Sequence, residues 1–179
     1  MSNPTISRQI WRLMIPDGAV GADEVYWDMF NASGSGCVIE VSAVRVVTVG
    51  DVAVTGELGI NLHLQKSSAV GTGGTAATLQ GTDPTAATFS TVSQPPGELP
   101  DGVTARLKPT GGATAGAWIN QCAVFTEETN AGTYTEKWLH NTNEEIISLP
   151  PGAGLQVVQG SVASVGSVGY VVNFGVRLL

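Results

Sequence analysis

Few side chains of this chain could carry out acid-base or nucleophilic chemistry, and their spacing matches no common active site. A serine or cysteine nucleophile needs a histidine to accept its proton, and the sequence has two, His63 and His140. His63 occupies the polar face of an alternating segment and His140 ends another, so both are expected to be solvated or hydrogen-bonded surface residues. The chain also lacks a Gly-x-Ser-x-Gly motif. The sequence therefore favours no serine or cysteine hydrolase.

Two pairs of adjacent carboxylates, Glu127-Glu128 and Glu144-Glu145, are the candidates for a glycoside hydrolase site, which needs two acidic side chains facing one cleft. Adjacent residues of a strand point to opposite faces, so each pair supplies at most one carboxylate to a cleft. Both pairs also adjoin turn-like segments, where charged side chains are usually solvated. We therefore expect a protein that is not an enzyme.

Metal and phosphate motifs are incomplete in the two segments that come closest to them. The run from Asp17 to Glu24 carries carboxylates but lacks the alternating oxygen ligands of an EF-hand loop. The run from Gly71 to Gly74 is rich in glycine, but no Walker lysine and no helical pattern follow it. The sequence thus predicts no metal ion and no other cofactor.

Apolar and polar residues alternate along most of the chain, which is the period of half-buried strands and not of helices. The segment from Leu58 to Gln65 alternates leucine or isoleucine with polar or small residues. Further strands are expected at residues 25–30, 37–49, 103–108, 117–127, 133–140, 145–149, 155–160 and 169–178. The apolar phase shifts near Ala43 and Val44, which predicts a bulge or a bend there.

Turns rich in glycine, proline or asparagine separate these strands, and the pattern predicts an all-β fold. An antiparallel β-sandwich that is jelly-roll-like is the first choice, with a long Gly/Thr/Ala-rich loop between Ser67 and Gly102. An immunoglobulin-like sandwich is the second choice, because Cys37, Trp118 and Cys122 lack the cysteine and tryptophan spacing of that fold.

The chain is long enough for one domain with a substantial core. Residues 16–179 are expected to form a single β-sandwich domain. Residues 1–15 are expected to be either a first strand of the sandwich or an arm that docks elsewhere. Pro16-Asp17-Gly18 is expected to form a turn after this segment.

The composition excludes several classes of partner. Only 13% of the 179 residues are charged, the net charge is −7 at pH 7, and the eight basic residues are scattered, so nucleic acid binding is not expected. No apolar stretch is long enough to cross a membrane, and the N-terminus lacks a secretory signal pattern. Cys37 and Cys122 are expected to be buried free thiols, with one disulfide as the alternative.

The four tryptophans divide into two pairs by their neighbours. Trp27 and Trp118 lie within apolar strand-like segments and are expected in the core. Trp11 and Trp138 each adjoin a basic residue, so they are the better candidates for an interface with another protein.

Two segments carry a resemblance to a known class of proteins. GTGGTAATLQGTDPTAATFS runs from Gly71 to Ser90 and contains one titratable residue, Asp83, while LPPGAGLQVVQG gives a rigid turn before a strand. Together they resemble small virion proteins of tailed double-stranded DNA bacteriophages, namely head-decoration (cement) or head-fibre proteins with jelly-roll-like domains. Ala153 stands between two glycines where an acidic residue often stands in such relatives, so a role tied to that acid is not carried over.

The resemblance implies a non-enzymatic virion structural protein that decorates and stabilises a phage capsid. Its partners would be the major capsid protein shell and its own copies, as a homotrimer, with a position on the capsid surface after synthesis in the host bacterial cytoplasm. A carbohydrate- or receptor-binding head-fibre or tail module is the alternative. The candidate interface residues are Arg8, Trp11, Arg12, Gly71, Thr72, Gly73, Gly74, Thr75 and Trp138.

Overall fold

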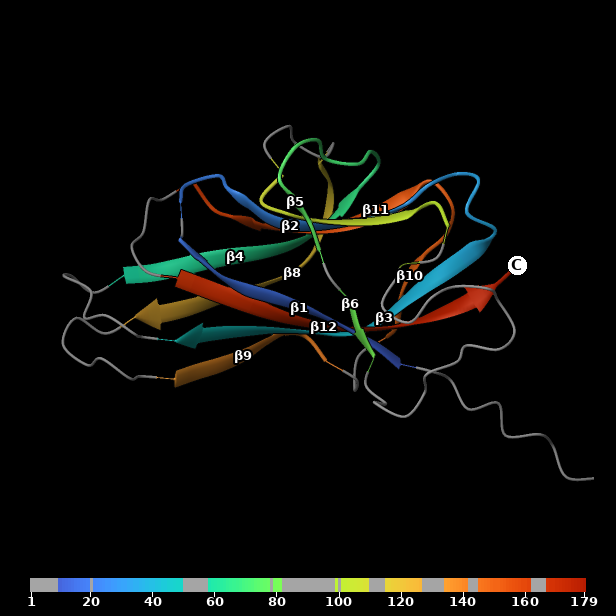
Figure 1. The fold of residues 1–179 in the computed structure, drawn as a ribbon. Helices are drawn as coiled ribbons and strands as arrows, with labels where there is room; N and C mark the ends of the chain where they lie inside the picture. Colours follow the sequence, from blue (N-terminus) through green and yellow to red (C-terminus); the bar gives the residue numbers. More distant parts are fainter. Residues whose placement is uncertain are drawn as a thin grey trace, which may run out of the picture.

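The computed structural model describes residues 10–19, 21–49, 58–77, 79–81, 99, 101–109, 115–126, 134–141, 145–161 and 167–179. These residues form two antiparallel β-sheets that pack face to face, and they include no helix (Figure 1). The expected all-β sandwich is thus confirmed. The described strands are β1 (Ile10–Ala19), β2 (Val25–Asn31), β3 (Cys37–Val49), β4 (Leu58–Ser67), β5 (Thr75–Ala76), β6 (Leu79–Gly81), β7 (Val103–Leu107), β8 (Ala115–Thr126), β9 (Tyr134–His140), β10 (Ile147–Leu149), β11 (Ala153–Gln159) and β12 (Ser167–Leu178).

The order of the strands is that of a jelly roll. The first sheet runs β6-β1-β12-β3, and both β9 and β10 pair with the far side of β3. The second sheet runs β5-β7-β2-β11-β4-β8. The chain alternates between the sheets from β1 to β4 and again from β10 to β12, which is the double Greek-key connection of a jelly roll. The jelly-roll expectation is therefore confirmed.

The core lies between the two sheets and is filled by alternate residues of the strands. Ile60, Leu62 and Leu64 on β4 are fully buried, in the phase that the alternation predicts. Trp27 on β2 meets Tyr170 on β12 edge to face, with ring centroids 6.5 Å apart, so the core joins the two sheets through aromatic contacts as well as aliphatic ones.

Two irregularities bend the first sheet. Asn173 on β12 pairs with Ala43 and the next residue pairs with Val41, so Ser42 is an extra residue and the predicted bulge is present. The register of β1 against β12 also shifts between Ile15 and Gly18. The expected turn at residues 16–18 is therefore wrong: the chain passes through them as a bulged part of β1.

Asn31 at the end of β2 fastens the second sheet to the first. Its buried Nδ2 donates hydrogen bonds to the carbonyl oxygens of Cys37, at 2.8 Å, and Leu149, at 2.9 Å. Both acceptors belong to the first sheet, on β3 and β10. The carboxamide of Asn31 thus satisfies two buried carbonyl groups that water does not reach, and it links the two sheets where β2 ends.

The segment between Ser67 and Gly102 folds back on its own sandwich where the structure describes it. β5 pairs with β7 at the edge of the second sheet, and β6 pairs with β1 in the first sheet. Residues 78, 82–98 and 100 lie outside the described residues. The segment thus crosses from one sheet to the other along one side of the sandwich.

The remaining sequence expectations concern the N-terminus and the thiols. Residues 10–19 form β1, between β12 and β6, and residues 1–9 lie outside the described residues. No described segment forms a helix long and apolar enough to cross a membrane.

Cys37 is buried and Cys122 is only partly buried, and the two are not joined by a disulfide bond. Burial raises the pKa of the Cys122 thiol to about 11, although the nearby Lys137 lowers it.

Candidate functional site

The glycine-rich candidates from Gly71 to Thr75 lie on the outside of the second sheet. Gly71 is buried, and its N–H donates to Oδ2 of Asp28 at 2.7 Å. Arg106 on β7 donates to the carbonyl of Gly73 at 3.0 Å. Residues 72–75 are exposed. Hydrogen bonds therefore attach this run to β2 and β7, while residues 72–75 remain exposed to solvent.

The other candidate interface residues that the structure describes lie on strands toward opposite edges of the first sheet. Arg8 lies outside the described residues, and Trp11 is on β1 opposite Gly81 of β6. Arg12 is exposed, and its Nε donates to Oδ1 of Asn173 at 3.4 Å. Trp138 is on β9 at the far edge of this sheet and is 47% exposed, beneath the guanidinium of Arg45 at 5.9 Å. The candidates whose side chains the structure describes do not form one surface.

Trp118 is a correction to the sequence analysis, because it is 64% exposed instead of buried in the core. On β8, Asn120 pairs with Leu64 but Trp118 pairs with Gln65, which leaves Ile119 as an extra residue. This bulge inverts the phase of the strand. Ile119 packs against the core, and Trp118 lies on the outer face of the second sheet.

His63 lies directly beneath Trp118. The two ring centroids are 4.0 Å apart and the ring planes are inclined by 30°. His63 is on the polar face of β4 as expected, but it is 6% exposed, so the expectation of a solvated histidine is wrong. His140, at 4% exposed, is likewise buried and not solvated. Among the described residues, His63 Nδ1 has no hydrogen-bond partner.

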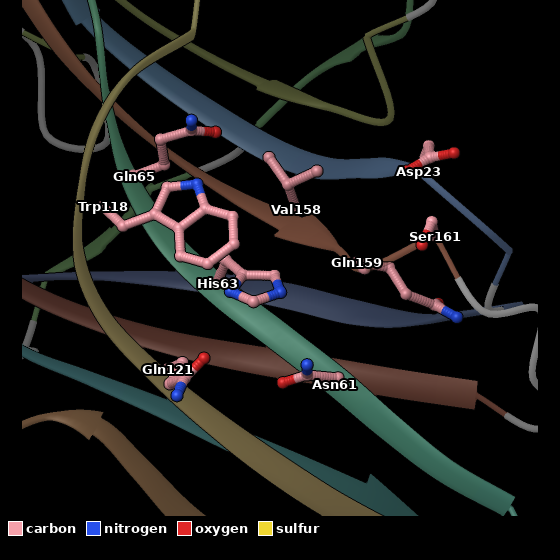
Figure 2. Close-up of a pocket in the computed structure, with 10 residues that line it drawn as sticks. Asp23, Asn61, His63, Gln65, Trp118, Gln121, Val158, Gln159 and Ser161 are labelled. Carbon is pink, nitrogen blue, oxygen red and sulfur yellow. The ribbon is translucent and has the colours of Figure 1, made fainter.

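The Trp118 and His63 rings form one wall of a groove on the outer face, called here the outer groove. Its volume is about 530 Å³, within the range of about 300–1,000 Å³ that small-molecule sites occupy. Figure 2 shows the two stacked rings with Gln65 on one side and with Gln121 and Asn61 on the other. The lining residues are Asp23, Asn61, His63, Gln65, Trp118, Gln121, Val158, Gln159, Gly160 and Ser161.

Hydrogen bonds fix the floor of the outer groove. Gln65 Nε2 donates to the carbonyl of Gly116 at 2.9 Å, and Gln65 Oε1 accepts from Gln156 at 3.1 Å. Gln156 pairs with Asp28 on the next strand, so a row of polar side chains crosses β4, β11 and β2. Burial raises the pKa of Asp28, while the Gly71 N–H and then Arg106 lower it. Of this row, Gln65 lines the groove, and its two hydrogen bonds hold its buried carboxamide in place.

A second groove, the edge groove, lies between the two sheets where β8 faces β10. Its volume is about 600 Å³, and it is lined by Lys66, Ala117, Trp118, Ile119, Asn120, His140, Glu145, Ile146, Ile147 and Ser148. Ile146 is 46% exposed, and Trp138 lies on the same edge of the first sheet, since β9 and β10 both pair with β3. Lys137 bridges the sheets here by donating to the carbonyl of Ala123 at 2.6 Å.

The carboxylate pairs and the acidic run from Asp17 to Glu24 gain no support as catalytic or metal sites from the described geometry. Glu145 is exposed, and residues 127, 128 and 144 lie outside the described residues. Glu24 forms an ion pair of 2.8 Å with Lys108. Among the residues that the structure describes, no three histidine, cysteine, aspartate or glutamate side chains gather as metal ligands.

The fold is a jelly roll whose second sheet carries a groove lined largely by carboxamide side chains, and an exposed apolar edge adjoins this sheet. No protein-family model matches this chain, and no curated protein or solved structure is significantly similar to it. The physical features of the two grooves must therefore carry the functional argument. A jelly roll alone does not, because the same fold serves capsid proteins, lectins and enzymes.

Asn61 and Gln121 are residues of the outer groove that sequence reasoning did not single out. Both are exposed, and they lie on neighbouring strands of its outer face. One signal was present in the sequence: the polar face of the strand from Leu58 to Ser67 carries Asn61, His63 and Gln65, with no charged side chain among them. Asn and Gln are ordinary surface residues, so this signal marks a polar outer face and does not by itself identify a ligand site.

Proposed function

We propose that this chain is a non-enzymatic structural protein of a virion, which decorates a phage capsid by binding the major capsid protein shell. The observation that carries the proposal is the edge groove. Its exposed Ile146 and the neighbouring Trp138 place apolar surface where both sheets end. Apolar side chains grouped at an edge are typical of a protein interface.

The scarcity of charge supports the same function. With 13% charged residues and a net charge of −7, the surface offers neutral and apolar groups in place of the charged rim of an ordinary monomer. We propose a homotrimer, because a threefold oligomer fits the local threefold axes of an icosahedral shell. Three linked sites raise the effective concentration of the second and third contacts to roughly the millimolar range.

The test is reconstitution on capsids that lack this chain. Adding the purified protein should increase their resistance to heat in a saturable way, because each bound trimer links neighbouring capsomers. Ile146→Asp and Trp138→Ala should weaken this binding, while Leu178→Asp, a change at an exposed apolar residue away from the edge groove, should leave it intact. Mass measurement in solution tests the trimer. Capsids that are equally heat-resistant with and without the protein would contradict the proposal.

A second candidate function is a carbohydrate- or receptor-binding module of a head fibre or tail. The specific observation in its favour is the outer groove, where exposed Trp118 rests on His63. A protein whose only task is to pack against a shell has no need for an amide-lined groove with a fixed aromatic wall. Ligand binding in the outer groove is therefore a proposal separate from capsid binding at the edge groove.

A further inference from the structure

Trp118 is exposed, yet its ring is held in one orientation. One face lies on His63 at a centroid distance of 4.0 Å, while the side chain as a whole is 64% exposed. His63 itself cannot move aside easily, because it is buried on β4 between strands β11 and β8. The open face of the indole is thus a rigid, flat platform whose orientation is fixed before any ligand arrives.

The polar groups around this platform are neutral and can both donate and accept hydrogen bonds. Asn61 and Gln121 are exposed on the same face, next to the stacked rings (Figure 2). A carboxamide presents two donors and an acceptor with two lone pairs. This combination matches hydroxyl groups, each of which also donates and accepts.

The charge of the outer groove excludes anionic ligands. No lysine or arginine is among its lining residues, and its one ionisable acid is Asp23 at the far end. Phosphate or sulfate groups would meet no lysine or arginine there and would be repelled by Asp23 and by the net charge of −7. A neutral ligand with an apolar face for Trp118 and several hydroxyls for the carboxamides fits these groups.

We infer that the outer groove binds a neutral saccharide. One sugar ring stacks its C–H face on the open face of Trp118, because the negative π-face of indole attracts such polarised C–H groups. Asn61 and Gln121 bind the hydroxyls at the ring's edge, and His63 is a positioning residue that holds the indole. The inference rests on the outer groove alone and holds whether or not the chain decorates a capsid.

The experiment is binding of the purified full chain to an array of oligosaccharides built from neutral hexoses, N-acetylhexosamines and deoxyhexoses, with sulfated and sialylated members included. Neutral members should bind and anionic ones should not. Each neutral member that binds is then titrated by calorimetry. Trp118→Ala should weaken binding by roughly tenfold or more, Gln121→Ala by less, and Trp118→Phe should keep most of it.

Trp138→Ala is the matched control, because it removes a second exposed tryptophan from the other sheet and should leave saccharide binding unchanged. The melting temperature of each variant shows whether it folds. If Trp118→Ala fails to fold, Trp118→Phe and Gln121→Ala decide the outcome. The inference is overturned by an array with no neutral member bound, by preferential binding of anionic members, or by equal loss in Trp118→Ala and Trp138→Ala.

Discussion

The backbone N–H of Gly71 donates a hydrogen bond of 2.7 Å to the carboxylate of Asp28. Asp28 is 1% exposed, and its second oxygen has no hydrogen-bond partner in the described part of the chain. A buried carboxylate with incomplete hydrogen bonding is costly when it is charged. Burial therefore raises its pKa, against the opposing effects of the Gly71 N–H and Arg106.

This relationship predicts a pH dependence of stability. Because the folded pKa of Asp28 lies above its unfolded value, its contribution to stability is full below the unfolded pKa and is lost as pH rises through the folded pKa. Asp28→Asn removes that dependence but keeps an oxygen to accept from Gly71. The melting temperature of the wild type minus that of the variant should thus be larger at about pH 4 than at about pH 7. A difference in melting temperature that does not vary with pH would contradict the conclusion that burial raises the pKa of Asp28.

The register of β4 predicts opposite results at two adjacent positions. Leu62 is fully buried and Asn61 is exposed. Leu62→Asp places a charge in the core and should cost about 3 kcal/mol of unfolding free energy or more, whereas Asn61→Asp should change it by about 0.5 kcal/mol or less. Urea titration of both variants measures the difference, and equal tolerance would show that the register is wrong.

Asn31→Asp should also destabilise the sandwich strongly. The substitution replaces the Nδ2 donor with an oxygen that faces the carbonyl oxygens of Cys37 and Leu149. The two buried carbonyl oxygens then lose their hydrogen-bond donor and lie beside a buried acid, which should lower the free energy of unfolding by about 3 kcal/mol or more. Asn120→Asp is the control, because its side-chain oxygen still accepts from the N–H of Gln121. Thermal unfolding that is the same for both variants would refute this role of Asn31.

Two glycines with positive φ predict unequal costs for the same substitution. Gly74 has φ +67°, and a Cβ there would meet backbone atoms of Leu107 and lie 2.7 Å from the carbonyl oxygen of Lys108. Gly152 has φ +87° and open space around its Cβ position. Gly152→Ala should therefore lower the free energy of unfolding by about 1–2 kcal/mol, the penalty for a left-handed backbone conformation. Gly74→Ala should lower it by more. Denaturant midpoints give both values, and a smaller loss at Gly74 would be inconsistent with the close approach of β7.

Local alternation was sufficient to predict the strands that make up the sandwich. Ile60, Leu62 and Leu64 on β4 and Tyr170, Val172 and Phe174 on β12 are buried in the predicted phase. The alternation did not predict that His63 on β4 and Val171 on β12, which lie on the opposite faces, are buried as well. The strands β5 and β6, of two and three residues, are too short to carry a periodic signal. Their positions depend on pairing with β7 and β1, which are remote in sequence.

The candidate site was predicted less well, for a related reason. Trp118 is expected in the core because it lies within an apolar strand-like segment. An unbroken strand would also place it on the same side as the buried Val124. The extra residue at Ile119 depends on the pairing of β8 with β4, which the sequence of β8 alone does not reveal. The burial of His63 then follows from the position of Trp118, so one unseen bulge accounts for both errors.

The pairing of β1 with β12 also has a consequence for biosynthesis. β12 lies between β1 and β3, so the first sheet cannot close until the last strand has left the ribosome. Until then the apolar faces of the earlier strands stay open to other chains, as is common for slowly folding β-proteins with distant pairings. Slow translation, low temperature and chaperones should therefore increase the soluble yield. A chain cut before Ser167 leaves β1 and β3 without their shared partner and is destined for aggregation or degradation.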